Sequence, residues 1–183
     1  MGIFNYFYHI YLLTLHIEKC IVKEKKYSQF KSVNMKKVII FEDNPLDYNL
    51  ISGILVSLNL NFYPENESEF IFLRKAIGQC FSPLYNVKNK AEDEINQIFT
   101  NFGKDDIFCI IDFQMPWINP ERNNGLYIYE KFIGRNNIKI IFVSSSPEEK
   151  KIDRIKWFCR ENGYYFADKR DDSLSFIISD YVK

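Results

Sequence analysis

The feature that most constrains the fold is an alternation of short apolar runs with longer segments of helical spacing, which begins near Met35. The strongest runs are rich in β-branched residues, as is typical of strands that are buried on both faces of a parallel sheet. The five strand candidates are Val38–Phe41, Asn59–Tyr63, Ile107–Ile111, Ile138–Val143 and Tyr164–Ala167. Because helical segments separate these strands, the pattern predicts a doubly wound α/β domain with a five-stranded parallel sheet.

Helix signals lie between the strand candidates. Asn44-Pro45 is typical of an N-cap followed by proline at the first helical position, and apolar residues recur after it at helical spacing. Ser146-Pro147-Glu148-Glu149 has the pattern of a capping box. Gly125–Ile133 and Ser173–Tyr181 also carry their apolar residues on one helical side. These segments supply the crossovers that parallel strands require.

The segment between the second and third strands is longer than one crossover needs. Glu65–Gln79 and Ala91–Phe102 both have the spacing of helices, whereas Phe81–Lys90, which contains Pro83, is predicted to be a loop. One helix suffices to connect two parallel strands. We therefore predict a helical insertion of about residues 65–90 before the third strand.

Charge and cysteine content exclude several classes of protein. Lys and Arg number 24 and Asp and Glu number 24, so the chain has no overall electrostatic reason to bind nucleic acid or an anionic membrane. The cysteines, Cys20, Cys80, Cys109 and Cys159, are far apart and form no CxxC motif. This spacing excludes a zinc module and argues against a disulfide framework, so a cytoplasmic location is expected.

Residues 1–34 are treated as an N-terminal extension. The apolar run of residues 3–17 is shorter than the roughly 20 residues that cross a bilayer, so no transmembrane segment is predicted. No basic residue precedes the run, and no small-residue cleavage site follows it, which argues against a secretory signal. His9 and His16 lack a third ligand for a metal. Three interpretations stay open: an interfacial or docking helix, a helix packed on the domain, or sequence upstream of a true start at Met35.

Polar residues follow the apolar strands at the points where the strands end. Glu42-Asp43 follows the first strand, Asp112 the third and Ser144 the fourth, and Lys169 comes just after the fifth. Open parallel sheets bind ligands outside the carboxyl ends of their strands, so we expect these side chains to converge. Carboxylates brought together repel one another unless a cation joins them, and Mg²⁺ prefers such oxygen ligands. The lysine would supply a positive charge for an anion such as a phosphoryl group.

Four separated motifs in the same order resemble the receiver domain of bacterial two-component response regulators. They are FEDNPLD after the first strand, IIDFQMP after the third, IIFVS at the fourth and ADK after the fifth. The resemblance spans about residues 35–183, and it implies a flavodoxin-like receiver fold. It also implies a phosphoacceptor signalling domain rather than a separate enzyme.

The resemblance assigns the phosphoacceptor and the metal ligands. Asp112 would accept a phosphoryl group from a histidine kinase or a phosphotransfer protein. Glu42, Asp43, Asp112 and the backbone carbonyl of Gln114 would hold Mg²⁺, with Asp43 as a direct ligand and Glu42 acting through water. Phosphorylation of Asp112 would then be read by a downstream protein target.

The resemblance also assigns the residues that respond to phosphorylation. Ser144 would hydrogen-bond the phosphoryl oxygens, and Lys169 would pair with the phosphate. Phe166 stands where the family has an aromatic rotamer switch, so inward movement of Ser144 would vacate space that Phe166 can fill. The surface made by the fourth and fifth strands and the helix between them would change as a result.

The sequence departs from the family pattern in two places near the site. Arg170 replaces the proline that usually follows the lysine, so the cis peptide of the family is not expected to be conserved here, and the reach of Lys169 is open. Residues 117–124, WINPERNN, lengthen the loop after the third strand. The chain ends at the last predicted helix, so the resemblance implies a stand-alone receiver.

Two alternatives belong to other functional classes. A pseudo-receiver would keep the fold and act as a protein-interaction module without phosphorylation. A phosphatase of the haloacid dehalogenase type would also use a strand-end aspartate with Mg²⁺, but it would need a second aspartate where this chain has Gln114.

Overall fold

The computed structural model describes residues 37–102, 107–116, 118, 124–134, 138–145, 149–171 and 174–182. The expectations for residues 1–34, for the helix cap at 146–148 and for most of the loop 117–124 lie outside these residues. No helix in the described ranges is long and apolar enough to span a membrane.

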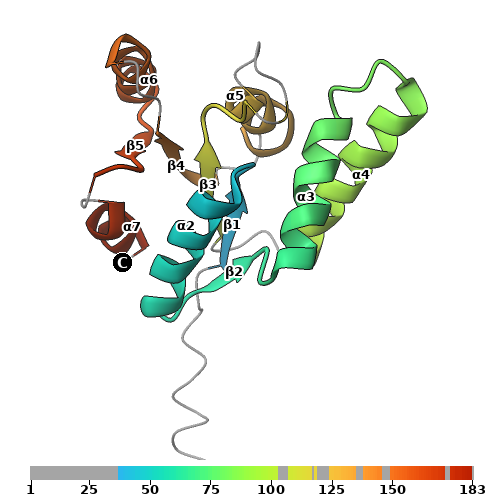
Figure 1. Cartoon of the computed structure of the whole chain (residues 1–183). Helices are drawn as coiled ribbons and strands as arrows, with labels where there is room; N and C mark the ends of the chain where they lie inside the picture. The colour runs from blue at the N-terminus through green and yellow to red at the C-terminus, as the bar shows by residue number, and fades with distance from the viewer. Residues whose placement is uncertain are drawn as a thin grey trace, which may run out of the picture. The chain divides into compact units, whose positions relative to one another are not determined.

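Five strands form one parallel sheet in the order β2-β1-β3-β4-β5. The strands are β1 (Lys37–Phe41), β2 (Asn61–Tyr63), β3 (Ile107–Asp112), β4 (Lys139–Ser144) and β5 (Tyr165–Asp168). The described helices are α2 (Pro45–Ser57), α3 (Glu67–Gln79), α4 (Tyr85–Phe102), α5 (Asn124–Ile128), α6 (Glu149–Glu161) and α7 (Leu174–Val182), shown in Figure 1. The predicted α/β class and five-stranded parallel sheet are confirmed, and the strand order is compatible with a flavodoxin-like fold.

Helices cover both faces of the sheet. Because successive residues of a strand point to opposite faces, neighbouring residues of one strand pack on different helices. Val38 and Ile40 of β1 pack with α2 and α7, whereas Ile39 and Phe41 pack with α3, α4, α5 and α6. α3 and α4 lie side by side at one end of the sheet, and α6 lies at the other (Figure 1). The inner strands β1, β3 and β4 are therefore buried on both faces over most of their length, which explains their nearly continuous apolar sequence. The edge strands β2 and β5 keep exposed residues.

The segment before β3 contains two helices, with a boundary that differs from the prediction. The prediction of a loop over Phe81–Lys90 is wrong in its second half, because α4 begins at Tyr85. Pro83 precedes this helix rather than interrupting it, and Ser82 Oγ accepts a hydrogen bond from Leu84 N at 3.2 Å. Polar residues form the first turns of α4, so hydrophobic periodicity identifies only the later part, where Ala91, Ile95 and Ile98 are buried.

The predicted helix Gly125–Ile133 changes its winding midway. α5 passes into a π-helical turn, η1 (Tyr129–Ile133), that closes with a hydrogen bond from Gly134 N to Tyr129 O at 2.8 Å. The Tyr129 ring packs on Phe142 of β4 and on Tyr164, and the two tyrosine hydroxyls are hydrogen-bonded. These contacts come from distant parts of the chain, so local spacing could not predict the wider turn.

The second strand is also shorter than predicted, because it begins at Asn61 rather than Asn59. Asn59 has a φ of 54°, which is left-handed and incompatible with an extended strand. Asparagine tolerates this conformation better than other non-glycine residues. It therefore closes α2 and redirects the chain into β2.

Candidate functional site

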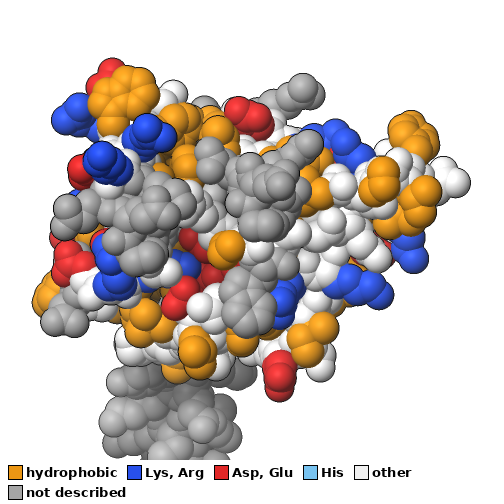
Figure 2. Space-filling view, turned by 45° about the horizontal axis from the view of Figure 1, so that its top comes forward, with side chains coloured by type: hydrophobic (Ala, Val, Ile, Leu, Met, Phe, Trp, Pro, Cys, Tyr) orange, Lys and Arg blue, Asp and Glu red, His pale blue; other side chains and the backbone are white. Residues whose placement is uncertain are grey.

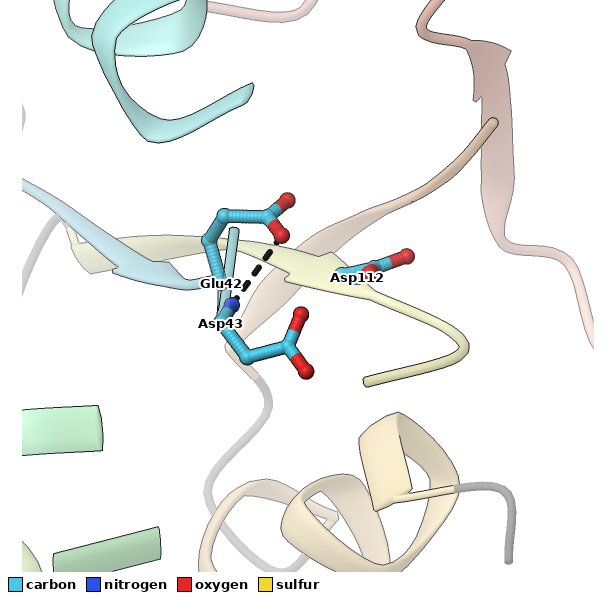
Figure 3. Close-up of side chains that lie close together, drawn as sticks. All are labelled: Glu42, Asp43 and Asp112. Atoms are coloured by element: carbon cyan, nitrogen blue, oxygen red, sulfur yellow. Dashed lines mark hydrogen bonds between the residues drawn. The ribbon is translucent and has the colours of Figure 1, made fainter. Parts of the chain in front are cut away.

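The polar residues at the strand ends converge at one edge of the sheet. β1, β3, β4 and β5 are adjacent and parallel, so Glu42 and Asp43, Asp112, Ser144 and Lys169 lie outside neighbouring carboxyl ends. Figure 3 shows Glu42 and Asp43 at the end of β1 beside Asp112 at the end of β3. Acidic side chains gather near the centre of this edge in the space-filling view (Figure 2). The predicted convergence is thus present in the fold.

Burial distinguishes this group from the rest of the described chain. The buried polar or charged residues among the described positions are Glu42, Asp43, Asp112, Asn124, Ser144 and Lys169. Five of these six are the strand-end residues, and Asn124 begins the helix that follows β3. Burying charges costs free energy unless they are paired, so this concentration at one place indicates a functional site.

Lys169 is the positive centre of the site. Its Nζ lies 2.9 Å from Glu42 Oε2, 2.8 Å from Asp47 Oδ2 and 3.3 Å from Asp112 Oδ2. Burial alone would lower the pKa of Lys169, but the charges of Glu42 and Asp112 outweigh burial and raise it. The ammonium is therefore held charged inside the protein.

The three carboxylates of the strand ends crowd one another. Ligand oxygens of Glu42, Asp43 and Asp112 all lie within 4.8 Å of each other. Burial raises the pKa of Asp112 well above its usual value, and the charge of Glu42 adds to this rise, while Lys169 opposes it. Burial likewise raises the pKa of Glu42, again against the effect of Lys169. The site therefore has an excess of negative charge.

An excess of buried carboxylate fits a hard divalent cation. Oxygen atoms are the ligands that Mg²⁺ prefers, and a bound cation would relieve the repulsion that raises these pKa values. Both oxygens of Glu42 are already engaged, since Oε1 accepts hydrogen bonds from the backbone N–H groups of Asp43 and Asn44 at 3.0 Å and Oε2 contacts Lys169. Asp43 and Asp112 are accordingly better placed than Glu42 to ligate a metal directly.

Backbone hydrogen bonds hold the two loops that frame Asp112. Gln114 N donates to Asp112 Oδ1 at 3.3 Å, and Phe113 N donates to Val143 O of β4 at 2.9 Å. Lys169 N donates to Ser144 O at 2.9 Å, which extends the pairing of β4 and β5 up to the site. The positions of Asp112 and Lys169 are therefore set by the sheet and not by free loops.

Asn124 and Gly125, which sequence reasoning did not assign to the site, close the loop after β3. Asn124 Nδ2 donates to Met115 O at 2.8 Å. A Cβ added at Gly125 would lie 2.1 Å from the backbone oxygen of Asp112, so only glycine fits there. A glycine that directly follows a loop and begins a helix was the available signal for such a close approach.

The residues predicted to form the switch lie on the face covered by α6. Ser144 is buried at the end of β4, and Phe166 of β5 is partly buried against the core. Phe166 pairs in register with Phe142, two residues before Ser144. Lys156 Nζ of α6 lies 5.9 Å from the centre of the Phe166 ring. The two residues therefore share one side of the sheet, at adjacent levels.

Arg170 does not keep Lys169 from the site. The cis peptide bond among the described residues joins Tyr63 and Pro64, and the Lys169–Arg170 peptide is trans. Arg170 instead forms a two-point ion pair with Asp168, with distances of 3.0 Å and 2.6 Å. Hydrogen bonding to Arg170 lowers the pKa of Asp168. Lys169 reaches Asp112 with this arrangement in place.

Asp47 is a further site residue that the sequence did not reveal. Its signal was that of an acidic residue in the first turn of a helix, which is common without any functional role. Its contact with Lys169 joins the first turn of α2 to the residue that follows β5, and no local pattern encodes that long-range contact.

No protein-family model matches the sequence, and a search of curated proteins found no match.

Proposed function

We propose that this chain is a phosphoacceptor signalling domain of the response regulator receiver type, with Asp112 as the phosphorylated residue. The contact between the buried Lys169 ammonium and Asp112, at 3.3 Å, supports this proposal most directly. It places a fixed positive charge beside a strand-end carboxylate, which is what a site needs to stabilise charge on a transferring phosphoryl group.

The reaction assigned to Asp112 is a phosphoryl transfer. One carboxylate oxygen attacks the phosphorus of a phosphohistidine, the P–N bond breaks, and its electron pair remains on the imidazole nitrogen. The product is an acyl phosphate on Asp112. Attack of water on the phosphorus later breaks the P–O bond, which returns the carboxylate and releases inorganic phosphate.

The chain's own residues have distinct parts in this reaction. Lys169 pairs with a phosphoryl oxygen, and Ser144 donates a hydrogen bond to another. Asp43, Asp112 and the carbonyl of Gln114 would hold Mg²⁺, which when bound supplies positive charge against the phosphoryl oxygens. The buried position of these groups strengthens their electrostatic effect, because little water screens them.

The output is a change of surface on the side of α6. Phosphorylation adds close to two negative charges beside Ser144. Movement of Ser144 toward the phosphoryl group would make room for Phe166, and the surface formed by β4, α6 and β5 would then differ between the two states. A downstream protein that binds one state better would read the signal. Trp157 on α6 offers exposed apolar area for such contact.

Intact-mass spectrometry tests the phosphoacceptor role. The protein is incubated with a small-molecule phosphodonor and Mg²⁺, and the expected result is an increase by one phosphoryl group. Asp112→Asn should give no increase, and neither should wild type with a chelator. Asp153→Asn, which removes an exposed carboxylate on α6, should behave as wild type.

A pseudo-receiver is the second candidate, and one observation favours it. Lys169 already has carboxylate partners on three sides, so the site can satisfy its lysine without a phosphoryl group. Absence of any adduct from the wild-type protein, together with no response to a beryllofluoride mimic, would favour this function over the receiver.

A further inference from the structure

Asp47 makes the shortest ion pair of Lys169, at 2.8 Å, although it belongs to none of the strand ends. It lies in the first turn of α2. Asn44 Oδ1 caps this helix by accepting from Leu46 N at 3.0 Å. The next residue, Tyr48, donates its hydroxyl to Pro64 O at 2.9 Å and stacks on Phe70. The turn that carries Asp47 is therefore held on both sides of that residue.

The three carboxylates around Lys169 differ in their access to water. The side chains of Glu42 and Asp112 are 0% and 4% exposed, whereas that of Asp47 is 21% exposed. A carboxylate that loses its cation inside a protein is strongly destabilised, but one at the surface can be hydrated instead. Asp47 is thus the partner that Lys169 can leave at the lowest cost.

The limited number of N–H donors on Lys169 makes the difference in exposure among its three carboxylate partners important. An ammonium group has three N–H donors and no acceptor, and Lys169 has three carboxylate partners. Phosphorylation turns the Asp112 carboxylate into an acyl phosphate, so its contact with Lys169 passes to the phosphoryl oxygens, which lie beyond the carboxylate. An ammonium that moves toward these oxygens draws away from its two other partners. Glu42 is fully buried, so Asp47 is the partner that gives way.

We propose that Asp47 is a positioning residue that holds the Lys169 ammonium before phosphorylation and competes with the phosphoryl group for it. This inference rests on the proposed receiver function. Its consequence is that phosphorylation releases the first turn of α2 from Lys169, in addition to any change on the side of α6. Phosphoryl binding is therefore weaker than it would be without Asp47.

Calorimetric titration of the protein with beryllofluoride, a phosphoryl mimic, at saturating Mg²⁺ tests the competition. Asp47→Asn keeps the shape of the side chain and removes its charge, and it should bind the mimic about fivefold more tightly, or ~1 kcal/mol. Asp47→Glu keeps a carboxylate at this position and should bind the mimic nearly as weakly as wild type does. Asp47→Gln, compared with Asp47→Glu, gives a second charge comparison if the asparagine variant does not fold.

Asp168→Asn is the matched control. Its carboxylate has a similar side-chain exposure, 18%, and is adjacent to Lys169 in sequence, but it pairs with Arg170. This variant should bind the mimic as wild type does, which separates loss of the Asp47 contact from a general loss of negative charge.

The outcomes separate the two proposals. If wild type binds the mimic and Asp47→Asn binds it with equal or lower affinity, the competition is overturned and the receiver function stays in place. Absence of binding by wild type, with its fold verified by circular dichroism, would overturn the receiver function and the competition with it. Tighter binding in both Asp47→Asn and Asp168→Asn would also reject a specific part for Asp47.

Discussion

Replacing Lys169 with methionine is expected to destabilise the domain strongly in the absence of Mg²⁺. Methionine keeps an unbranched apolar side chain and removes the ammonium, which lies 2.9 Å from Glu42, 2.8 Å from Asp47 and 3.3 Å from Asp112. The Glu42 and Asp112 side chains have almost no solvent access, so water cannot replace the lost cation.

The expected magnitude follows from this burial. Removing one partner of a buried ion pair typically costs ~3–5 kcal/mol. The contact with the more exposed Asp47 adds little, because solvent screens it. With a urea m-value of ~2 kcal/mol/M for a domain of this size, the unfolding midpoint should fall by about 2 M.

Urea unfolding at neutral pH with a chelator measures this loss, and two variants test its cause. Lys150→Met removes an exposed lysine of α6 and should change the free energy of unfolding by less than ~0.5 kcal/mol. Adding Glu42→Gln to Lys169→Met should recover part of the stability, because one buried charge fewer remains unpaired. A loss below ~1 kcal/mol, or no recovery in the double variant, would refute the view that Lys169 neutralises these carboxylates.

Three further predictions concern the site and its support. The stability of the Mg²⁺-free protein should fall as pH rises from the usual carboxyl range through the raised pKa values of Glu42 and Asp112, because the folded state binds their protons more tightly. Asp112→Asn should flatten this slope in urea unfolding measured across pH, and an unchanged slope would contradict the assignment. Gly125→Ala should lower the free energy of unfolding by about 2–3 kcal/mol or more. Gly53→Ala in α2, where an added Cβ meets nothing within 4 Å, should instead raise it by ~0.5–1 kcal/mol. Urea unfolding of both variants measures these changes. Tyr127→Phe and Glu92→Gln should show a coupling free energy of ~1 kcal/mol in a double-mutant cycle, because the Tyr127 hydroxyl donates to Glu92 Oε1 at 3.0 Å. Additive effects of the two substitutions would show that this hydrogen bond does not join α4 to α5.

The strands and the polar residues that end them were predictable because both are local in sequence. A strand buried on both faces needs a run of apolar residues, and a polar residue directly after such a run must lie at the edge of the sheet. For this reason Glu42, Asp43, Asp112, Ser144 and Lys169 could be named before the fold was known.

The exact winding of the helices was less predictable. The first turns of α4 are polar, and their helical state is supported by i,i+4 ion pairs such as Lys88–Glu92 and by packing of the later turns. The π-helical turn after α5 depends on the contacts of Tyr129 with Phe142 and Tyr164. Each of these features is decided by residues outside the segment that adopts it.

The sequence alone determined the α/β alternation and the chemical types present at the strand ends. Only the tertiary structure decided how those groups are paired. Lys169 meets Glu42 across 127 positions of the sequence, and it meets Asp47 only because the fold brings the first turn of α2 within reach of its side chain. Burial and pairing of charges are properties of the folded arrangement, so no local pattern could assign Asp47 to the site or show which carboxylate remains in contact with water.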